Sequence, residues 1–134
     1  MRIAKYGRTT LDIGMGCLLL FLLSYPLTRG LYRHGIIGGV LLILFVLHHL
    51  LNLRLYRALF RGTYTLRRCM AISMEFLLLA ATLAVMFSSM YLSGEVFTLF
   101  LFPMTWWARS LHNCATAWLF LLAAIHLGLH WRGL

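Results

Sequence analysis

Six histidines are the residues of this 134-residue sequence whose type and spacing are best suited to chemistry. They fall into two groups separated by about half of the chain, and they are His34, His48, His49, His112, His126 and His130. Most of them interrupt apolar runs, where a polar, titratable ring costs free energy unless it has a partner. An imidazole in such a setting is either a hydrogen-bonding group between helices or a ligand of a metal.

The spacing within the two groups is the same. His34 and His48 are 14 residues apart, and so are His112 and His126. At ~100° and 1.5 Å per residue, this separation returns to within ~40° of the starting direction and covers ~21 Å of helix. Each group therefore predicts one helix with two imidazoles on one face. A constant offset of 78 residues relates His34 to His112 and His48 to His126, which indicates a weak two-fold internal repeat.

Two levels of facing imidazoles are what two bis-histidine b-type haems require, because each iron takes one neutral nitrogen from either side. We expect the two histidine-bearing helices to run in the same direction. His34 then lies level with His112 near the outer surface, and His48 lies level with His126 toward the cytoplasm. The sequence predicts two non-covalent haems with these four metal ligands. Hydrogen bonding between helices is the alternative, and it is strongest for His34, at the edge of its apolar run.

The two remaining histidines have no mate at the 78-residue offset. His49 points ~100° away from His48, so we expect it to be a hydrogen-bonding or interfacial residue. His130 follows His126 by one turn on the same face. It is expected either to contact a haem propionate or a quinone head group, or to lie at a solvated helix end.

Two arginines are the basic residues nearest the predicted outer haem. Arg33 precedes His34 directly, and Arg109 lies about one turn before His112. A guanidinium pairs well with a carboxylate, so both are predicted to bind haem propionates. Anchoring of the helix ends at lipid head groups is the alternative.

The elements that must carry these residues are apolar helices. The chain is 62% hydrophobic, which is too much apolar surface for one soluble core of this size. A helix needs ~20 apolar residues to cross ~30 Å of hydrocarbon. Four runs of about that length predict an all-α, four-transmembrane-helix bundle that forms a single domain over residues 1–134; they are Leu11–Leu27, Ile36–Leu53, Met70–Leu92 and Trp106–Leu129. The first run has no small-residue cleavage site, so we expect a mature helix rather than a signal peptide.

The formal charge of +9 is distributed unevenly between the two predicted membrane surfaces. Nine basic residues fall on one side: Arg2, Lys5, Arg8, Arg54, Arg57, Arg61, Arg67, Arg68 and Arg132. Three fall on the other: Arg29, Arg33 and Arg109. An excess of Lys and Arg marks cytoplasmic loops, so we expect both termini in the cytoplasm and anionic lipid, not nucleic acid, as the partner of these charges.

Other chemistries have little support in the sequence. Cys17, Cys69 and Cys114 form no Cys-x-x-Cys motif, which argues against a thiolate zinc site or covalent haem attachment. The three acids are too few for a carboxylate metal site or a proton relay. For Glu75 we expect extension toward the interface, with assistance to quinone protonation as the alternative.

Several motifs resemble the flavinylation-associated cytochromes, small four-helix bacterial membrane proteins related in plan to the cytochrome b subunits of formate dehydrogenases and hydrogenases. They are "RTTLDIGM" at 8–15, "RHGIIGG" at 33–39, "HHLLNLRLYRALFRGTY" at 48–64, "LHNCATAW" at 111–118 and "HLGLHW" at 126–131. The resemblance covers nearly the whole chain, and its most specific pieces are His48 with Asn52 and His126 with His130. It implies b-type haem, adds Asn52 to the cofactor-contacting residues, and implies electron exchange between membrane quinone and a flavin-bearing or other redox protein.

The sequence thus predicts a membrane cytochrome b of the bacterial cytoplasmic membrane, acting as an electron-transfer subunit rather than a catalyst on its own. We expect a hetero-oligomeric complex with quinone or quinol and with a flavin-bearing, iron-sulfur or multihaem partner. Two alternatives stay open. One is a ferric-reductase-like domain, and the other is a haem-free four-helix scaffold subunit.

Overall fold

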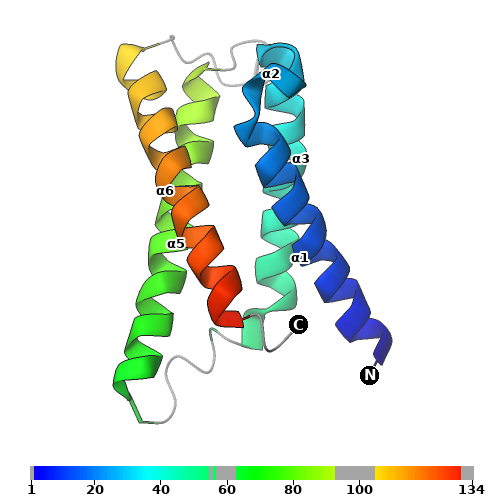
Figure 1. The fold of residues 1–134 in the computed structure, drawn as a ribbon, viewed down its shortest axis with the longest axis vertical. Helices are drawn as coiled ribbons and strands as arrows, with labels where there is room; N and C mark the ends of the chain where they lie inside the picture. The colour runs from blue at the N-terminus through cyan, green and yellow to red at the C-terminus, as the bar shows by residue number, and fades with distance from the viewer. Residues whose placement is uncertain (1, 55, 57–62, 93–104, 131–134) are drawn as a thin grey trace. The chain divides into compact units, whose positions relative to one another are not determined.

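The structure is a computed structural model that describes residues 2–54, 56, 63–92 and 105–130, with side chains from residue 6 to residue 129 of these ranges. Every regular element within them is a helix. Figure 1 shows α1 (Arg2–Leu23), α2 (Tyr25–Thr28), α3 (Leu31–Leu51), α5 (Leu66–Leu92) and α6 (Trp106–His130). The chain divides into two compact units, Met1–Gly62 and Thr63–Leu134. The boundary between them falls between the two halves of the predicted repeat.

The predicted membrane character is confirmed for all four long helices. In the described residues, α1, α3, α5 and α6 are each long and apolar enough to cross a bilayer. Large apolar side chains lie exposed along them, including Leu20, Ile43 and Leu83 at 57%, 68% and 54% exposure. Such surface is stable only against lipid or other apolar partners. The chain is therefore an all-helical, multi-pass membrane protein.

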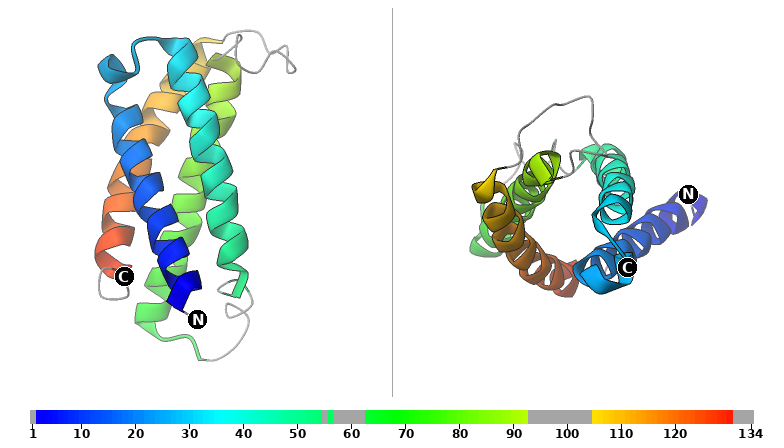
Figure 2. Two further views of the ribbon diagram at one scale, coloured as in Figure 1. Left: turned by 90° about the vertical axis from the view of Figure 1, so that its right-hand side faces the viewer. Right: turned by 90° about the horizontal axis from the view of Figure 1, so that it is seen from above.

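The first unit is an antiparallel pair of helices, α1 and α3, joined through the short helix α2 (Figure 2). The predicted first span continues to Leu27, but α1 ends at Leu23 and the chain bends at Ser24. The reason is Pro26, which has no N–H to donate to the preceding turn. Pro26 is instead accommodated in the first turn of α2, where no such bond is needed.

A tight turn between α2 and α3 reverses the chain. Arg29 has the left-handed conformation, with φ 50° and ψ 42°, and Gly30 follows with φ 128°. Thr28, only 2% exposed, donates from Oγ1 to the carbonyl oxygen of Tyr25 at 2.7 Å. The turn allows α3 to begin at Leu31, which places His34 within its first helical turn.

The second unit is the pair α5 and α6, which pack closely along their length. Small side chains lie at the contact, where Ser88 of α5 and Ala108 of α6 are both 0% exposed. Small residues let helix backbones approach one another in a membrane. Trp107 packs against Phe87 and Tyr91 of α5, with ring centroids 6.1 and 4.9 Å apart, so aromatic contacts close one end of the unit.

Candidate functional site

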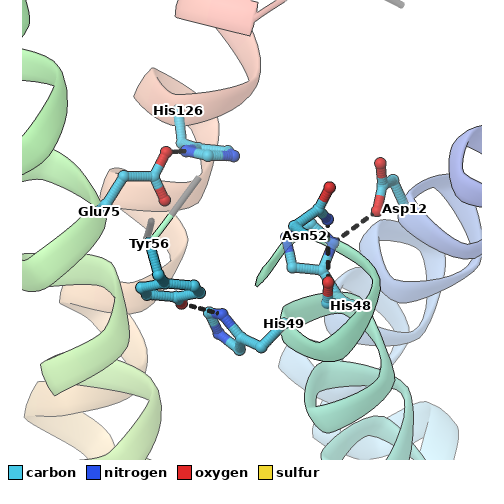
Figure 3. A network of polar contacts seen from close by, with 7 residues as sticks. All are labelled: Asp12, His48, His49, Asn52, Tyr56, Glu75 and His126. Atoms are coloured by element: carbon cyan, nitrogen blue, oxygen red, sulfur yellow. Dashed lines mark hydrogen bonds and ion pairs between the residues drawn. The ribbon is translucent and has the colours of Figure 1, made fainter. Parts of the chain in front are cut away.

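His48 contacts an acid from the neighbouring helix of its own unit. Its Nδ1 lies 2.7 Å from Oδ1 of Asp12 in α1, and both side chains are half-buried (Figure 3). Since an ionised carboxylate only accepts, Nδ1 is the donor. Asn52 ends the same helix, because its Nδ2 and its backbone N–H both donate to the carbonyl oxygen of His48, at 2.9 and 3.1 Å. Asn52 thus fixes the last turn of α3, which carries His48.

The second unit repeats this arrangement with different residues. Nδ1 of His126 in α6 lies 3.2 Å from Oε1 of Glu75 in α5 (Figure 3). Glu75, for which extension toward the membrane interface is predicted, thus lies beside a histidine of the neighbouring helix. The cause is the packing of α5 against α6, which brings the carboxylate within reach of the imidazole and gives both polar groups a partner in an apolar setting.

His112 contacts hydroxyl groups instead of a carboxylate. Its Nδ1 lies 3.3 Å from Oγ of Ser88 and 3.3 Å from Oγ of Ser89. Each serine donates its own proton to a carbonyl oxygen one turn earlier in α5, at 2.7 Å in both cases. The hydroxyl oxygens therefore accept, and Nδ1–H of His112 donates.

The contacts of His48 and His112 share one chemical result. When Nδ1 of a neutral imidazole carries the proton, the lone pair is on Nε2. Metal-binding histidines show the same division, in which one nitrogen donates to a carboxylate or other acceptor and the second binds the metal. Two of the four predicted ligands, His48 and His112, thus have Nδ1 placed to donate, as a metal ligand needs, and Nδ1 of His126 lies beside the carboxylate of Glu75.

The remaining predicted site residues have different surroundings. The ring of His34 lies 5.7 Å from that of Tyr25, at 54° between the planes. Arg33 and Arg109 are exposed at the starts of α3 and α6, so both are accessible to an anionic group. The side chain of His130 lies outside the described residues, as do those of Arg57, Arg61 and Arg132 from the charge pattern.

The contacts of His49 differ from those of the adjacent His48. Its Nδ1 is hydrogen-bonded to the hydroxyl group of Tyr56 (Figure 3). Its ring also meets that of Phe45 edge-on, with the ring centroids 4.3 Å apart. The expectation that His49 is a hydrogen-bonding residue is confirmed by the contact with Tyr56. The two adjacent histidines therefore have different partners. His48 contacts Asp12 of α1, whereas His49 contacts Tyr56, which follows it in the sequence.

Sequence reasoning missed the partners of the histidines, namely Asp12, Glu75, Ser88 and Ser89. A signal existed for the two acids, since a carboxylate within a membrane span requires a polar partner. No three His, Cys, Asp or Glu side chains converge within the described part of the chain, so a metal held only by such residues has no candidate there. A haem iron takes just two ligands from the protein.

No protein-family model, curated protein or solved structure matches this chain. Any function therefore has to be argued from the geometry of the residues themselves.

Proposed function

We propose that this chain is a membrane b-type cytochrome that relays electrons across the bilayer through two bis-histidine haems. The observation that carries the proposal is the shared setting of His48, His112 and His126. Nδ1 of each lies within 3.3 Å of a side-chain oxygen on the adjacent helix of its unit. Three histidines with Nδ1 beside an oxygen, in helices that repeat a 14-residue spacing, are better explained by a common ligand than by three unrelated contacts.

The donor set fits haem. A neutral imidazole whose Nδ1–H is held by an acceptor could bind a haem iron through Nε2. When bound, haem iron supplies reversible one-electron transfer between its ferric and ferrous states. The chain's own residues orient the rings and hold their protons on Nδ1, and no general acid or base is needed for such a relay.

In this proposal, the four histidines that share the 14-residue spacing would hold the two haems. His34 and His112 hold the outer haem, while His48 and His126 hold the inner one. Arg33 and Arg109 are exposed at helix starts, where they can bind the outer propionates, and His130 is assigned to the inner side. Asn52 supports the inner site by fixing the turn of His48.

The wider setting follows from the resemblance to flavinylation-associated cytochromes and from the charge pattern. The proposal places the chain in the bacterial cytoplasmic membrane, with both termini in the cytoplasm. Quinone or quinol exchanges electrons with one end of the relay, and a flavin-bearing, iron-sulfur or multihaem protein with the other. Substrate chemistry then takes place on that partner, in a hetero-oligomeric complex.

Haem stoichiometry tests the proposal directly. The purified chain should show a reduced b-type spectrum and two haems per chain by pyridine haemochrome. His48→Ala and His126→Ala should each lose the inner haem and retain about one. His49→Ala is the matched control and should retain two, since His49 is directed at Tyr56. A wild-type chain without haem, or two haems in both His48→Ala and His126→Ala, would reject the proposal.

A haem-free scaffold subunit is the second candidate. The observation in its favour is that the contacts of His48 and His126 already join the helices of each unit. In that case, the same variants should lower the stability of the chain, and the wild-type protein should have no haem spectrum. The spectrum of the wild-type chain therefore separates the two candidates.

A further inference from the structure

Two of the chain's three acids contact predicted ligands of the same haem. Asp12 in α1 accepts from His48 at 2.7 Å, and Glu75 in α5 lies 3.2 Å from Nδ1 of His126. The two contacts arise in different units and from helices that differ in sequence. Both acids contact a histidine of the inner level, although neither is related to the other by the 78-residue offset.

His112, a predicted outer ligand, has neutral acceptors where His48 and His126 lie beside carboxylates. His112 meets the hydroxyl oxygens of Ser88 and Ser89, both at 3.3 Å. The ring of His34 lies beside that of Tyr25. The contacts within the second unit thus place a carboxylate beside one histidine of α6 and hydroxyl groups beside the other.

We propose that Asp12 and Glu75 are positioning residues that lower the reduction potential of the inner haem below that of the outer haem. This inference rests on the proposed function. A carboxylate that accepts from Nδ1–H shifts negative charge onto the imidazole and makes Nε2 a stronger donor. Stronger donation and a nearby negative charge both stabilise ferric over ferrous iron, whereas a neutral hydroxyl adds no charge.

A difference in reduction potential gives the relay a preferred direction of electron transfer. An electron moves spontaneously from the centre of lower potential to the centre of higher potential. With both carboxylates at the inner level, the favoured transfer is from the inner haem to the outer haem. The sequence pattern of paired histidines is symmetric in this respect, so the direction comes from the acids.

Potentiometric titration of the full-length haem-loaded protein tests this inference. The variants are Asp12→Asn and Glu75→Gln, which keep the shape and an acceptor oxygen but remove the charge. Each should raise the lower of the two midpoint potentials and leave the upper one in place. We expect about a tenfold change in the ratio of reduced to oxidised inner haem at fixed ambient potential, which is about 59 mV for a one-electron couple.

Two controls accompany the variants. Glu95→Gln removes the same charge at the third acid of the chain and should move neither midpoint. Ser89→Ala alters the contact of His112 and should leave the lower midpoint in place. The double variant Asp12→Asn/Glu75→Gln should raise the lower midpoint further than either single change, because the two carboxylates act on opposite ligands of one iron.

The outcomes separate this inference from the proposed function. Two haems with unchanged midpoints in both variants would overturn the inference alone, as would variants that raise different midpoints. A wild-type chain without haem overturns both. If a variant loses one haem, the midpoint of the remaining haem decides, since the upper wild-type value supports the inference and the lower value contradicts it. A purely structural ion pair between helices would alter stability without moving either midpoint.

Discussion

Small side chains let the helices α5 and α6 approach one another closely. Ala108 lies at the contact of α5 and α6 with no exposed surface, as does Ser88 on the facing helix. In lipid, where burial of apolar surface between helices is no advantage over contact with acyl chains, close packing of small residues supplies much of the association energy. Size at these positions therefore matters more than hydrophobicity.

Ala108→Leu should destabilise the second unit. Three additional carbon atoms have no room at a fully buried contact, and overpacking of this kind typically costs about 1–3 kcal/mol. Ala117→Leu makes the same change at an exposed position of α6 and should be close to neutral. Thermal unfolding of both variants in the same detergent measures the difference. Equal melting temperatures for the two variants would show that the α5–α6 contact is looser than described.

The histidine pattern was predictable from the sequence because it depends on one helix at a time. Spacing of 14 residues fixes which imidazoles share a face, and this holds whatever lies opposite. The partners were not predictable in the same way. Asp12 and His48 are 36 residues apart, and their contact depends on how α1 is rotated against α3, which periodicity does not determine.

At the scale of elements, the connection between α2 and α3 is the most constrained piece of backbone. Arg29 is the non-glycine residue with positive φ among the described residues, and Gly30 follows at φ 128°. Only glycine adopts such a φ together with ψ 159° at little cost. The bend at Ser24 lies close to this connection. The predicted span Leu11–Leu27 ran through it, because hydropathy takes no account of the N–H group that Pro26 lacks.

Gly30→Ala should therefore destabilise the first unit by about 1–3 kcal/mol, because a Cβ atom strains this backbone conformation. Space is not the cause, since no atom lies within 4 Å of the added Cβ. Gly7→Ala is the control, at a helical glycine with equally open surroundings, and should be neutral or slightly stabilising. Chemical unfolding in detergent compares them. Similar midpoints for both variants would mean that α3 can begin without the strained turn.

At the scale of the whole molecule, the division of the chain into two units between Gly62 and Thr63 is the feature that is most readily tested by experiment. Each unit holds its own histidine contacts, so each has internal reasons to form its helix pair. The prediction of four helices long and apolar enough to cross a membrane is confirmed at this scale, because length and hydropathy are properties of each segment by itself. Orientation of the termini and the internal repeat stay predictions, since they concern the membrane and the relation between the halves.

Separate expression of residues 1–62 and 63–134 tests whether the haems join the two units. Produced together, the two fragments should copurify with about two haems per pair if the proposed function is correct, because that proposal assigns each haem one histidine from each fragment. Neither fragment alone should show a bis-histidine spectrum. Full haem loading of a single fragment would contradict the pairing of His34 with His112 and of His48 with His126, and would instead place both ligands within one unit.

The contact between Asp12 and His48 also has a consequence for how the chain enters the bilayer. Asp12 is synthesised 36 residues before its partner, and a carboxylate inside a span costs free energy unless it has a polar partner. A first helix released into lipid by itself would meet that cost before α3 exists. Glu75 precedes His126 in the same order. We therefore expect each helix to wait at the insertion machinery for its partner, so that the chain passes into the membrane as two hairpins rather than as four successive helices.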